Sequence, residues 1–211
     1  MERTNSGESS AARVLRVAWM AILLGLALEV VVATAANLQG AAWEPLRTVA
    51  SAGQRVSWSV ILCAVLAWAQ TIQPPNALRT GLFGFAGAPI AAIAARAVHK
   101  GVLQAGSATP AGGAGVPWGL IAVRALEYLL LGMLSTRLAR KRTHAHLTMG
   151  LAVGALGLAL QLTVLDASAS SSGAVLLLAL NELLFPAGCA VVLHAASAKA
   201  RRDEAARASV R

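Results

Sequence analysis

The chain has 211 residues, of which 57% are hydrophobic and 13% charged, with a formal net charge of +9 at pH 7. A water-soluble domain carries about 25% charged residues, so this chain has too few charges to cover a core with a polar surface. The composition therefore argues against an ordinary soluble domain. It predicts an all-α integral membrane protein, built as a six-helix transmembrane bundle.

The first predicted element is an apolar run over residues 14–36, after a polar segment, 1–13, that we expect to be disordered. About 20 apolar residues cross a bilayer as a helix. Glu29 shares a stripe of this run with Gly25, and small side chains on that face predict that Glu29 points into a bundle. The tripeptide 33–35 is similar to a secretory cleavage site, so retention and cleavage of the first span both stay open.

The second and third predicted spans are residues 56–72 and 80–98, separated by a turn-rich break that contains two prolines. The second is the shortest of the six. The third carries several glycines and Pro89, which predict a bent or thin helix that packs closely on a neighbour.

The fourth predicted span, residues 117–136, follows a glycine-rich linker and places Arg124 and Glu127 three residues apart. Side chains at this spacing share one face of a helix, which predicts an ion pair. The fifth span, 147–165, carries Gly150, Gly154, Gly157 and Gln161 on one stripe, and the G-x-x-x-G spacing predicts close helix contact.

The sixth predicted span, residues 173–196, contains Asn181 and Glu182, followed by Pro186. A proline inside a helix frees a backbone carbonyl that a ligand, a water molecule or a side chain can use. A basic cytoplasmic tail, residues 199–211, completes the chain.

The distribution of Lys and Arg predicts the orientation, because cytoplasmic loops carry an excess of these residues. With the N-terminus inside, thirteen fall on the cytoplasmic side and four, Arg47, Arg55, Arg96 and Lys100, on the other. We therefore expect a multi-pass protein of a bacterial-type cell inner membrane with both termini cytoplasmic. Because the basic residues flank apolar runs, we expect no direct nucleic-acid partner.

The two halves of the chain show a weak similarity. Ala-Leu-Glu occurs at residues 27–29 and 125–127, and Gly and Pro interrupt the third and sixth spans. A duplicated unit of three spans must be inverted relative to the first, and paired interrupted helices mark the binding sites of such transporters. Common descent and chance in an Ala/Leu-rich chain both explain the match.

Charged groups inside a membrane are costly and mark functional sites by default. The expected pathway for an ion, a proton or a small solute is lined by Glu29, Glu127, Glu182, Asn181 and Gln161, with Arg124 as counter-ion. Hydrogen bonds that only fix the bundle are the alternative for each of these residues.

Motifs for other chemistry are missing. We find no zinc-protease helix, nucleophile elbow or phosphate-binding loop, so we expect neither an enzyme nor a cofactor or metal. Cys63 and Cys189 form no C-x-x-C pair and are expected to be small buried side chains.

The sequence leaves two functional hypotheses. The first is a small-solute or proton-coupled permease that uses the intramembrane glutamates. The second is a membrane regulator that sequesters an acidic cytoplasmic protein, such as a sigma factor. This partner, or anionic lipid, would be bound by Arg137, Arg140, Lys141, Arg142, Arg201 and Arg202. In outline, by length, span number and Ala/Arg-rich composition, the chain resembles the light-responsive membrane anti-sigma factors of myxobacteria, although no motif carries that likeness.

Overall fold

The computed structural model describes residues 3–72, 76–106, 117–139, 141–164 and 172–208. Within these ranges the chain forms six α-helices and no strand. They are α1 (Arg3–Leu38), α2 (Pro45–Thr71), α3 (Ala77–Gly106), α4 (Trp118–Arg137), α5 (Thr143–Val164) and α6 (Ser172–Ala208). Each contains a segment long and apolar enough to cross a membrane, which supports a multi-pass membrane protein.

Several helices extend beyond the predicted spans. Helix α2 begins at Pro45 rather than at residue 56, and α3 continues to Gly106 rather than ending at 98. Proline suits the first position of a helix, as Pro45 does here, because a backbone N–H at that position has no hydrogen-bond partner within the helix and its absence costs nothing. Helix α1 begins at Arg3, inside the segment expected to be disordered, and α6 runs to Ala208. The predicted glycine-rich linker lies outside the described residues, apart from Gly106.

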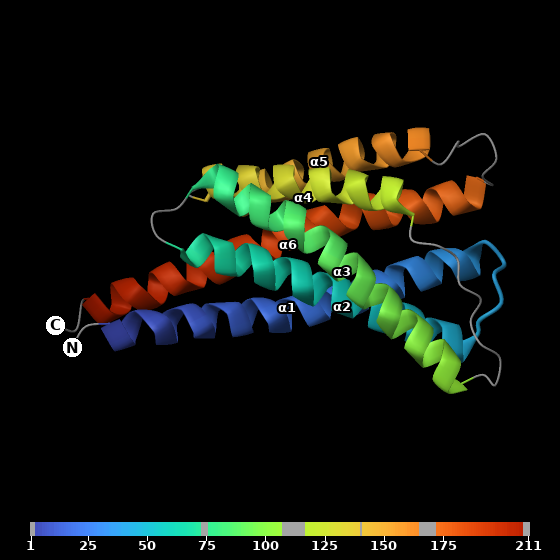
Figure 1. Ribbon diagram of the computed structural model, residues 1–211, viewed down its shortest axis with the longest axis horizontal. Helices are drawn as coiled ribbons and strands as arrows, with labels where there is room; N and C mark the ends of the chain where they lie inside the picture. The colour runs from blue at the N-terminus through green and yellow to red at the C-terminus, as the bar shows by residue number, and fades with distance from the viewer. Residues whose placement is uncertain (1–2, 73–75, 107–116, 140, 165–171, 209–211) are drawn as a thin grey trace.

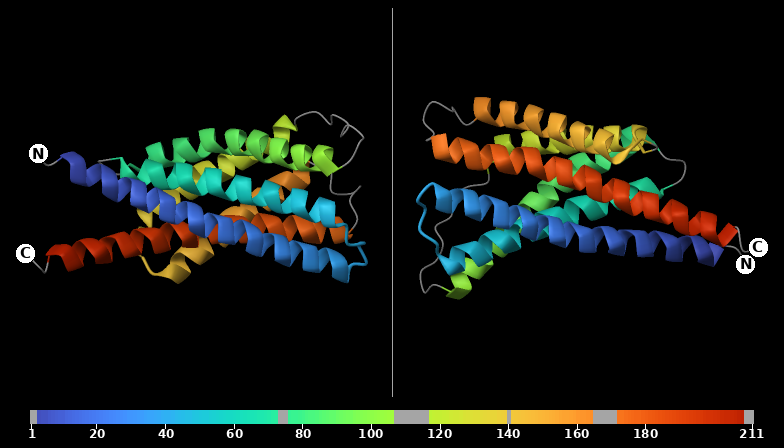
Figure 2. Two further views of the ribbon diagram at one scale, coloured as in Figure 1. Left: turned by 90° about the horizontal axis from the view of Figure 1, so that it is seen from below. Right: turned by 180° about the vertical axis from the view of Figure 1, so that it is seen from behind.

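The six helices form a closed bundle. Each helix packs on its neighbours in the chain, and α6 packs back on α1 to complete the ring. The N-terminal part of α1 and the C-terminal part of α6 lie at the same end in all views (Figures 1 and 2). We call this the terminal end of the bundle, and the other the distal end. Figure 1 shows that α3 crosses α4 near the terminal end and diverges from it toward the distal end.

Glycines set the closest helix contacts. A methyl group on Gly132 of α4 would lie 2.7 Å from the carbonyl oxygen of Thr80 in α3, and one on Gly150 of α5 would lie 2.7 Å from that of Pro186 in α6. No larger side chain fits at either position without moving a backbone. The close packing that the sequence predicts for Gly150 is therefore confirmed.

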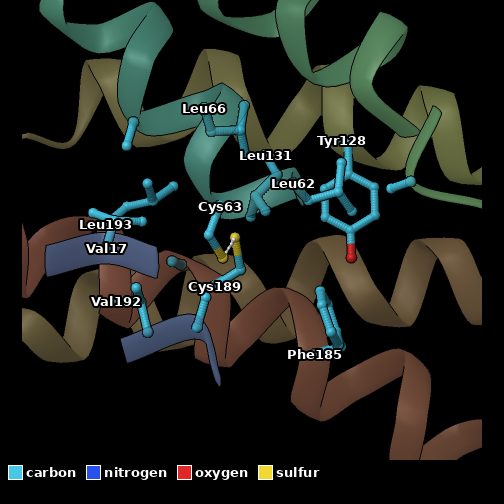
Figure 3. Close-up of a cluster of buried hydrophobic side chains, with 14 of the residues drawn as sticks. Val17, Leu62, Cys63, Leu66, Tyr128, Leu131, Phe185, Cys189, Val192 and Leu193 are labelled. Atoms are coloured by element: carbon cyan, nitrogen blue, oxygen red, sulfur yellow. Dashed lines mark hydrogen bonds between the residues drawn. The ribbon is translucent and has the colours of Figure 1, made fainter. Parts of the chain in front are cut away.

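The middle of the bundle is filled by apolar side chains from all six helices, and Figure 3 shows part of this core. Leu62, Leu66, Tyr128 and Leu131 are all 0% exposed. Cys63 and Cys189 lie in this core as predicted, also fully buried, and their sulfur atoms are 3.0 Å apart. This apolar layer separates the polar groups at the two ends of the bundle.

Candidate functional site

A continuous polar network lies in the distal half of the bundle. It joins side chains from five helices: Glu29 of α1, Ser51 and Arg55 of α2, Arg124 and Glu127 of α4, Gln161 of α5, and Asn181 and Glu182 of α6. The structure thus brings together all six residues that the sequence predicts as a pathway. Their role in a pathway stays a prediction.

The first part of the network surrounds Glu29, which is 7% exposed. Arg55 donates from Nε to Glu29 Oε2 at 2.6 Å, and the Ser51 hydroxyl donates to the same oxygen at 2.8 Å. Arg55 Nη1 also hydrogen-bonds to Oδ1 of Asn181. The guanidinium therefore links α1, α2 and α6 and offsets the cost of a carboxylate in an apolar bundle.

The second part surrounds Arg124, whose guanidinium lies between two carboxylates. Its Nη1 is 3.3 Å from Glu127 Oε2, as the spacing on α4 predicts, and its Nη2 forms an ion pair with Glu182 Oε1. Gln161 donates to the other Glu182 oxygen at 2.6 Å. Asn181 donates to Glu182 Oε1 at 3.4 Å, so protein groups from α4, α5 and α6 hold this carboxylate, which is 0% exposed.

The backbone near Glu182 has a local cause in the sequence. Pro186 has no N–H, so the carbonyl of Glu182, four residues earlier, lacks its usual helical hydrogen bond. Gly154 of α5 lies against this carbonyl and leaves no room for a side chain between the helices. The two features fix α6 closely on α5 at the level of the network.

The network holds one carboxylate more than it has guanidinium groups. Arg55 and Arg124 face Glu29, Glu127 and Glu182. Glu127 is 3% exposed, and its buried Oε1 has no hydrogen-bond partner in the described part of the chain. A buried anionic oxygen without a partner is costly, so this position suits a carboxyl group that takes up a proton or a cation.

A cavity of about 530 Å³ adjoins the network. Arg55, Arg124, Gln161, Asn181 and Glu182 line it directly, whereas Glu29 and Glu127 lie behind their arginine partners. All six helices contribute, each with residues from its distal half, and Pro117 at the start of α4 also lines the wall. The volume falls within the range of 300–1,000 Å³ typical of small-molecule sites.

Three aromatic rings separate the cavity from the apolar core. Trp58 and Phe185 line the cavity, and Tyr128 lies behind them. Their ring centroids are 6.0 to 6.4 Å apart in edge-to-face pairs, an arrangement that aromatic rings prefer. Figure 3 shows Tyr128 and Phe185 beside the core leucines. Arg124 lies 5.6 Å above the Trp58 ring, within reach of a cation–π interaction.

A second polar group closes the terminal end of the bundle. Arg13 donates to Gln70 at 2.7 Å and to Ser197 at 2.6 Å, and Gln70 donates to Ser135 at 3.1 Å. These bonds join α1, α2, α4 and α6. The space there measures only about 10 Å³, roughly room for one water molecule. The bundle is therefore hollow at the distal end and closed at the terminal end.

Sequence reasoning missed three features of these sites. Arg55 was assigned to a connection, and Arg96, near the end of the predicted span 80–98, was counted with the outer charges; both lie inside helices and line the cavity. His146 is 2% exposed and stacks on His194 with a centroid distance of 4.3 Å, a pair that no local pattern indicates. No group of three metal-binding side chains occurs within the described ranges.

The predicted partner-binding residues lie away from the cavity. Arg137, Lys141 and Arg142 are exposed at the terminal end. Arg140 is outside the described residues. Arg201 and Arg202 belong to the last turns of α6, but their side chains are also outside the described part.

Comparison with known proteins leaves the site to be interpreted from its geometry, since no family model, curated protein or solved structure matches this chain.

Proposed function

We propose that the chain is a polytopic inner-membrane permease that moves a small solute, coupled to a proton or an ion at the intramembrane glutamates. The observation that carries the proposal is the solute-sized cavity, which all six helices line and into which α2 to α6 direct polar groups. Concave sites with apolar walls and a few directed polar groups are typical of small-molecule binding. Charges of this kind within membrane-spanning helices mark solute and proton pathways.

The orientation of the cavity supports the same function. The excess of Lys and Arg near the termini favours a cytoplasmic terminal end, which turns the cavity toward the outside. The apolar core and the Arg13–Gln70–Ser197 group close the inner side. This is the asymmetry of a carrier that admits solute from one face at a time, and α1–α3 and α4–α6 would be the inverted halves that move against each other.

The extra carboxylate supports coupling. Glu127 Oε1 is buried without a hydrogen-bond partner in the described chain, so a proton or cation bound there would remove the unmatched charge. Its release would change the attraction to Arg124, which also holds Glu182 at the cavity wall. Solute binding and proton binding would then influence each other through one guanidinium group.

Uptake into proteoliposomes tests the proposal. Radiolabelled cinnamate, choline, leucine and glucose represent anionic, cationic, zwitterionic and neutral solutes. Uptake of each is measured with a proton gradient imposed so that protons flow into the proteoliposomes. We expect uptake of at least one above protein-free liposomes and its loss in Glu29→Gln and Glu182→Gln. The matched control is Glu44→Gln, since Glu44 is half exposed and lies outside the cavity.

Two results would count against this function. Uptake of none of the four solutes by correctly reconstituted protein would refute a permease. Full uptake by both glutamine variants would separate transport from the glutamate network. The inserted fraction of each variant, measured after carbonate extraction, has to match the wild type for either comparison.

A second candidate function is sequestration of an acidic cytoplasmic protein, which the exposed Arg137, Lys141 and Arg142 at the terminal end favour. Affinity capture from membranes would retain such a partner through the wild-type chain and lose it when these residues are replaced by glutamine. Equal capture by both proteins refutes this candidate. Permeation is favoured because sequestration at the surface leaves the internal cavity unexplained.

A further inference from the structure

Three guanidinium groups line the cavity, and they differ in their partners. Arg55 is paired with Glu29, and Arg124 with Glu127 and Glu182. Arg96 of α3, which is partly exposed, lines the same cavity without a hydrogen bond or ion pair to any described residue. Arg96 is therefore the one guanidinium of the wall that no described carboxylate contacts, since the extra carboxylate of the network, Glu127, contacts Arg124 instead. A ligand that carries one negative charge matches Arg96.

Much of the remaining wall is apolar. Val32, Leu120, Ile121, Leu177, Leu178 and Phe185 come from α1, α4 and α6. A ligand buried here gains about 25 cal/mol for each Å² of apolar surface removed from water. Trp58 adds an aromatic face. The lining therefore favours a ligand with an apolar body, not a small inorganic ion that remains hydrated.

The presence of a single unpaired guanidinium group also restricts the anionic group of the ligand. A phosphate ester carries between one and two negative charges near neutral pH and would need a second unpaired cation. A carboxylate carries one charge, and its two oxygens match the N–H fork of a single guanidinium. Asn181 and Gln161 supply further polar groups on the wall for a second polar atom of the ligand.

We propose that the cavity binds a compact water-soluble monocarboxylate with an apolar body, and that Arg96 pairs with its carboxylate. This inference rests on the proposed permease for its physiological role, but the binding site itself does not depend on transport. Arg96 determines specificity for the anion, and the apolar wall with Trp58 selects the body.

Equilibrium binding of radiolabelled cinnamate to the protein in lipid nanodiscs tests the inference. Cinnamamide and cinnamylamine keep the same body and replace the charge by none or by a positive one. We expect cinnamate to bind saturably and both analogues to compete at least tenfold more weakly. Removing one charge-assisted hydrogen bond corresponds to a factor of about ten or more, so Arg96→Gln should weaken cinnamate binding by that factor. Arg47→Gln, an exposed arginine of α2 that is not part of the wall, should not.

Several outcomes overturn the inference: equal competition by the amide or the amine, wild-type binding by Arg96→Gln, or no saturable binding by protein with wild-type helicity. Palmitate offers the same carboxylate from a membrane lipid. Competition by palmitate as strong as that by cinnamate would place the ligand in the bilayer and refute a water-soluble solute.

The two proposals fail separately. Saturable cinnamate binding without uptake of any solute refutes the permease and leaves the carboxylate site intact. Uptake of another solute by a protein that does not bind cinnamate refutes the substrate class alone.

Discussion

Removal of the Arg124 guanidinium tests the energetic role of the network. In Arg124→Met, two carboxylates whose side chains are 1% and 0% exposed lose their ion-pair partner. Removal of one member of a buried pair costs about 3–5 kcal/mol, because the other charge stays buried without compensation. Glu182 keeps the hydrogen bond from Gln161, so we expect a loss near the lower limit, about 3 kcal/mol.

The assay is reversible unfolding in mixed micelles, with helicity measured by circular dichroism as the mole fraction of sodium dodecyl sulfate increases. The control is Arg47→Met, since the Arg47–Glu44 pair is 74% and 53% exposed and such a pair contributes about 1 kcal/mol or less. Arg124→Lys keeps the positive charge but loses the forked N–H groups of the guanidinium, so its free energy of unfolding should lie between those of Arg124→Met and Arg47→Met.

A double-mutant cycle isolates the pair from other effects of the substitution. Glu182→Gln should destabilise the wild type more than it destabilises Arg124→Met, where the unpaired carboxylate is already present. Unfolding of Arg124→Met at the same detergent fraction as Arg47→Met would refute the conclusion that the guanidinium compensates buried charge.

Two further predictions concern the packing around the network. In Gly157→Ala, the new methyl group would lie 2.9 Å from the carboxyl carbon of Glu127 in α4. We therefore expect the free energy of unfolding to fall by about 1–3 kcal/mol in the same assay. Gly101→Ala, with nothing within 4 Å, should be neutral or slightly stabilising, and equal behaviour of the two would contradict the close α4–α5 contact. Oxidation by copper phenanthroline should form a disulfide between Cys63 and Cys189, whose sulfur atoms are 3.0 Å apart. A chain that carries a protease site between α3 and α4 should then stay in one piece on a denaturing gel after cleavage, until the disulfide is reduced. Separation of the two fragments before reduction would contradict the α2–α6 packing.

The number of helices and the six central polar residues could be predicted because each is a local property of the sequence. A run of about 20 apolar residues is sufficient to predict a span, and a charge within it stands out. Glu29 and Glu182 were identified in this way, and the structure places both in the network.

The position of Arg55 could not be predicted in the same way. Hydropathy is summed residue by residue, so an arginine counts with its full cost in a membrane even where a carboxylate on another helix pairs with it. A hydropathy window therefore assigns the arginine to a connection. Arg55 lies inside α2 because Glu29 and Asn181, on two other helices, accept its N–H groups. The stacked rings of His146 and His194 likewise come from α5 and α6 and meet only through tertiary packing.

The position of the cavity also depends on tertiary packing and could not be predicted from the sequence. The glycines predict close contacts, but not that α3 leaves α4 toward the distal end (Figure 1). In the early part of α3, Gly81 and Gly84 lie against α4, whereas Ala92, Ala95 and Arg96 farther along the helix line the cavity. Helix α3 therefore determines both the close contact with α4 and the opening of the cavity.

Whether the cavity opens only at the distal end is tested most directly by thiol labelling. Cysteine is introduced at Gln54, which lines the cavity, or at exposed Lys141 at the terminal end, in chains whose Cys63 and Cys189 are alanine. A membrane-impermeant methanethiosulfonate should label Gln54→Cys only from the face opposite to the one that labels Lys141→Cys, and cinnamate should slow the reaction. Labelling of both positions from the same face, or no labelling of Gln54→Cys from either face, would contradict a cavity that opens at the distal end.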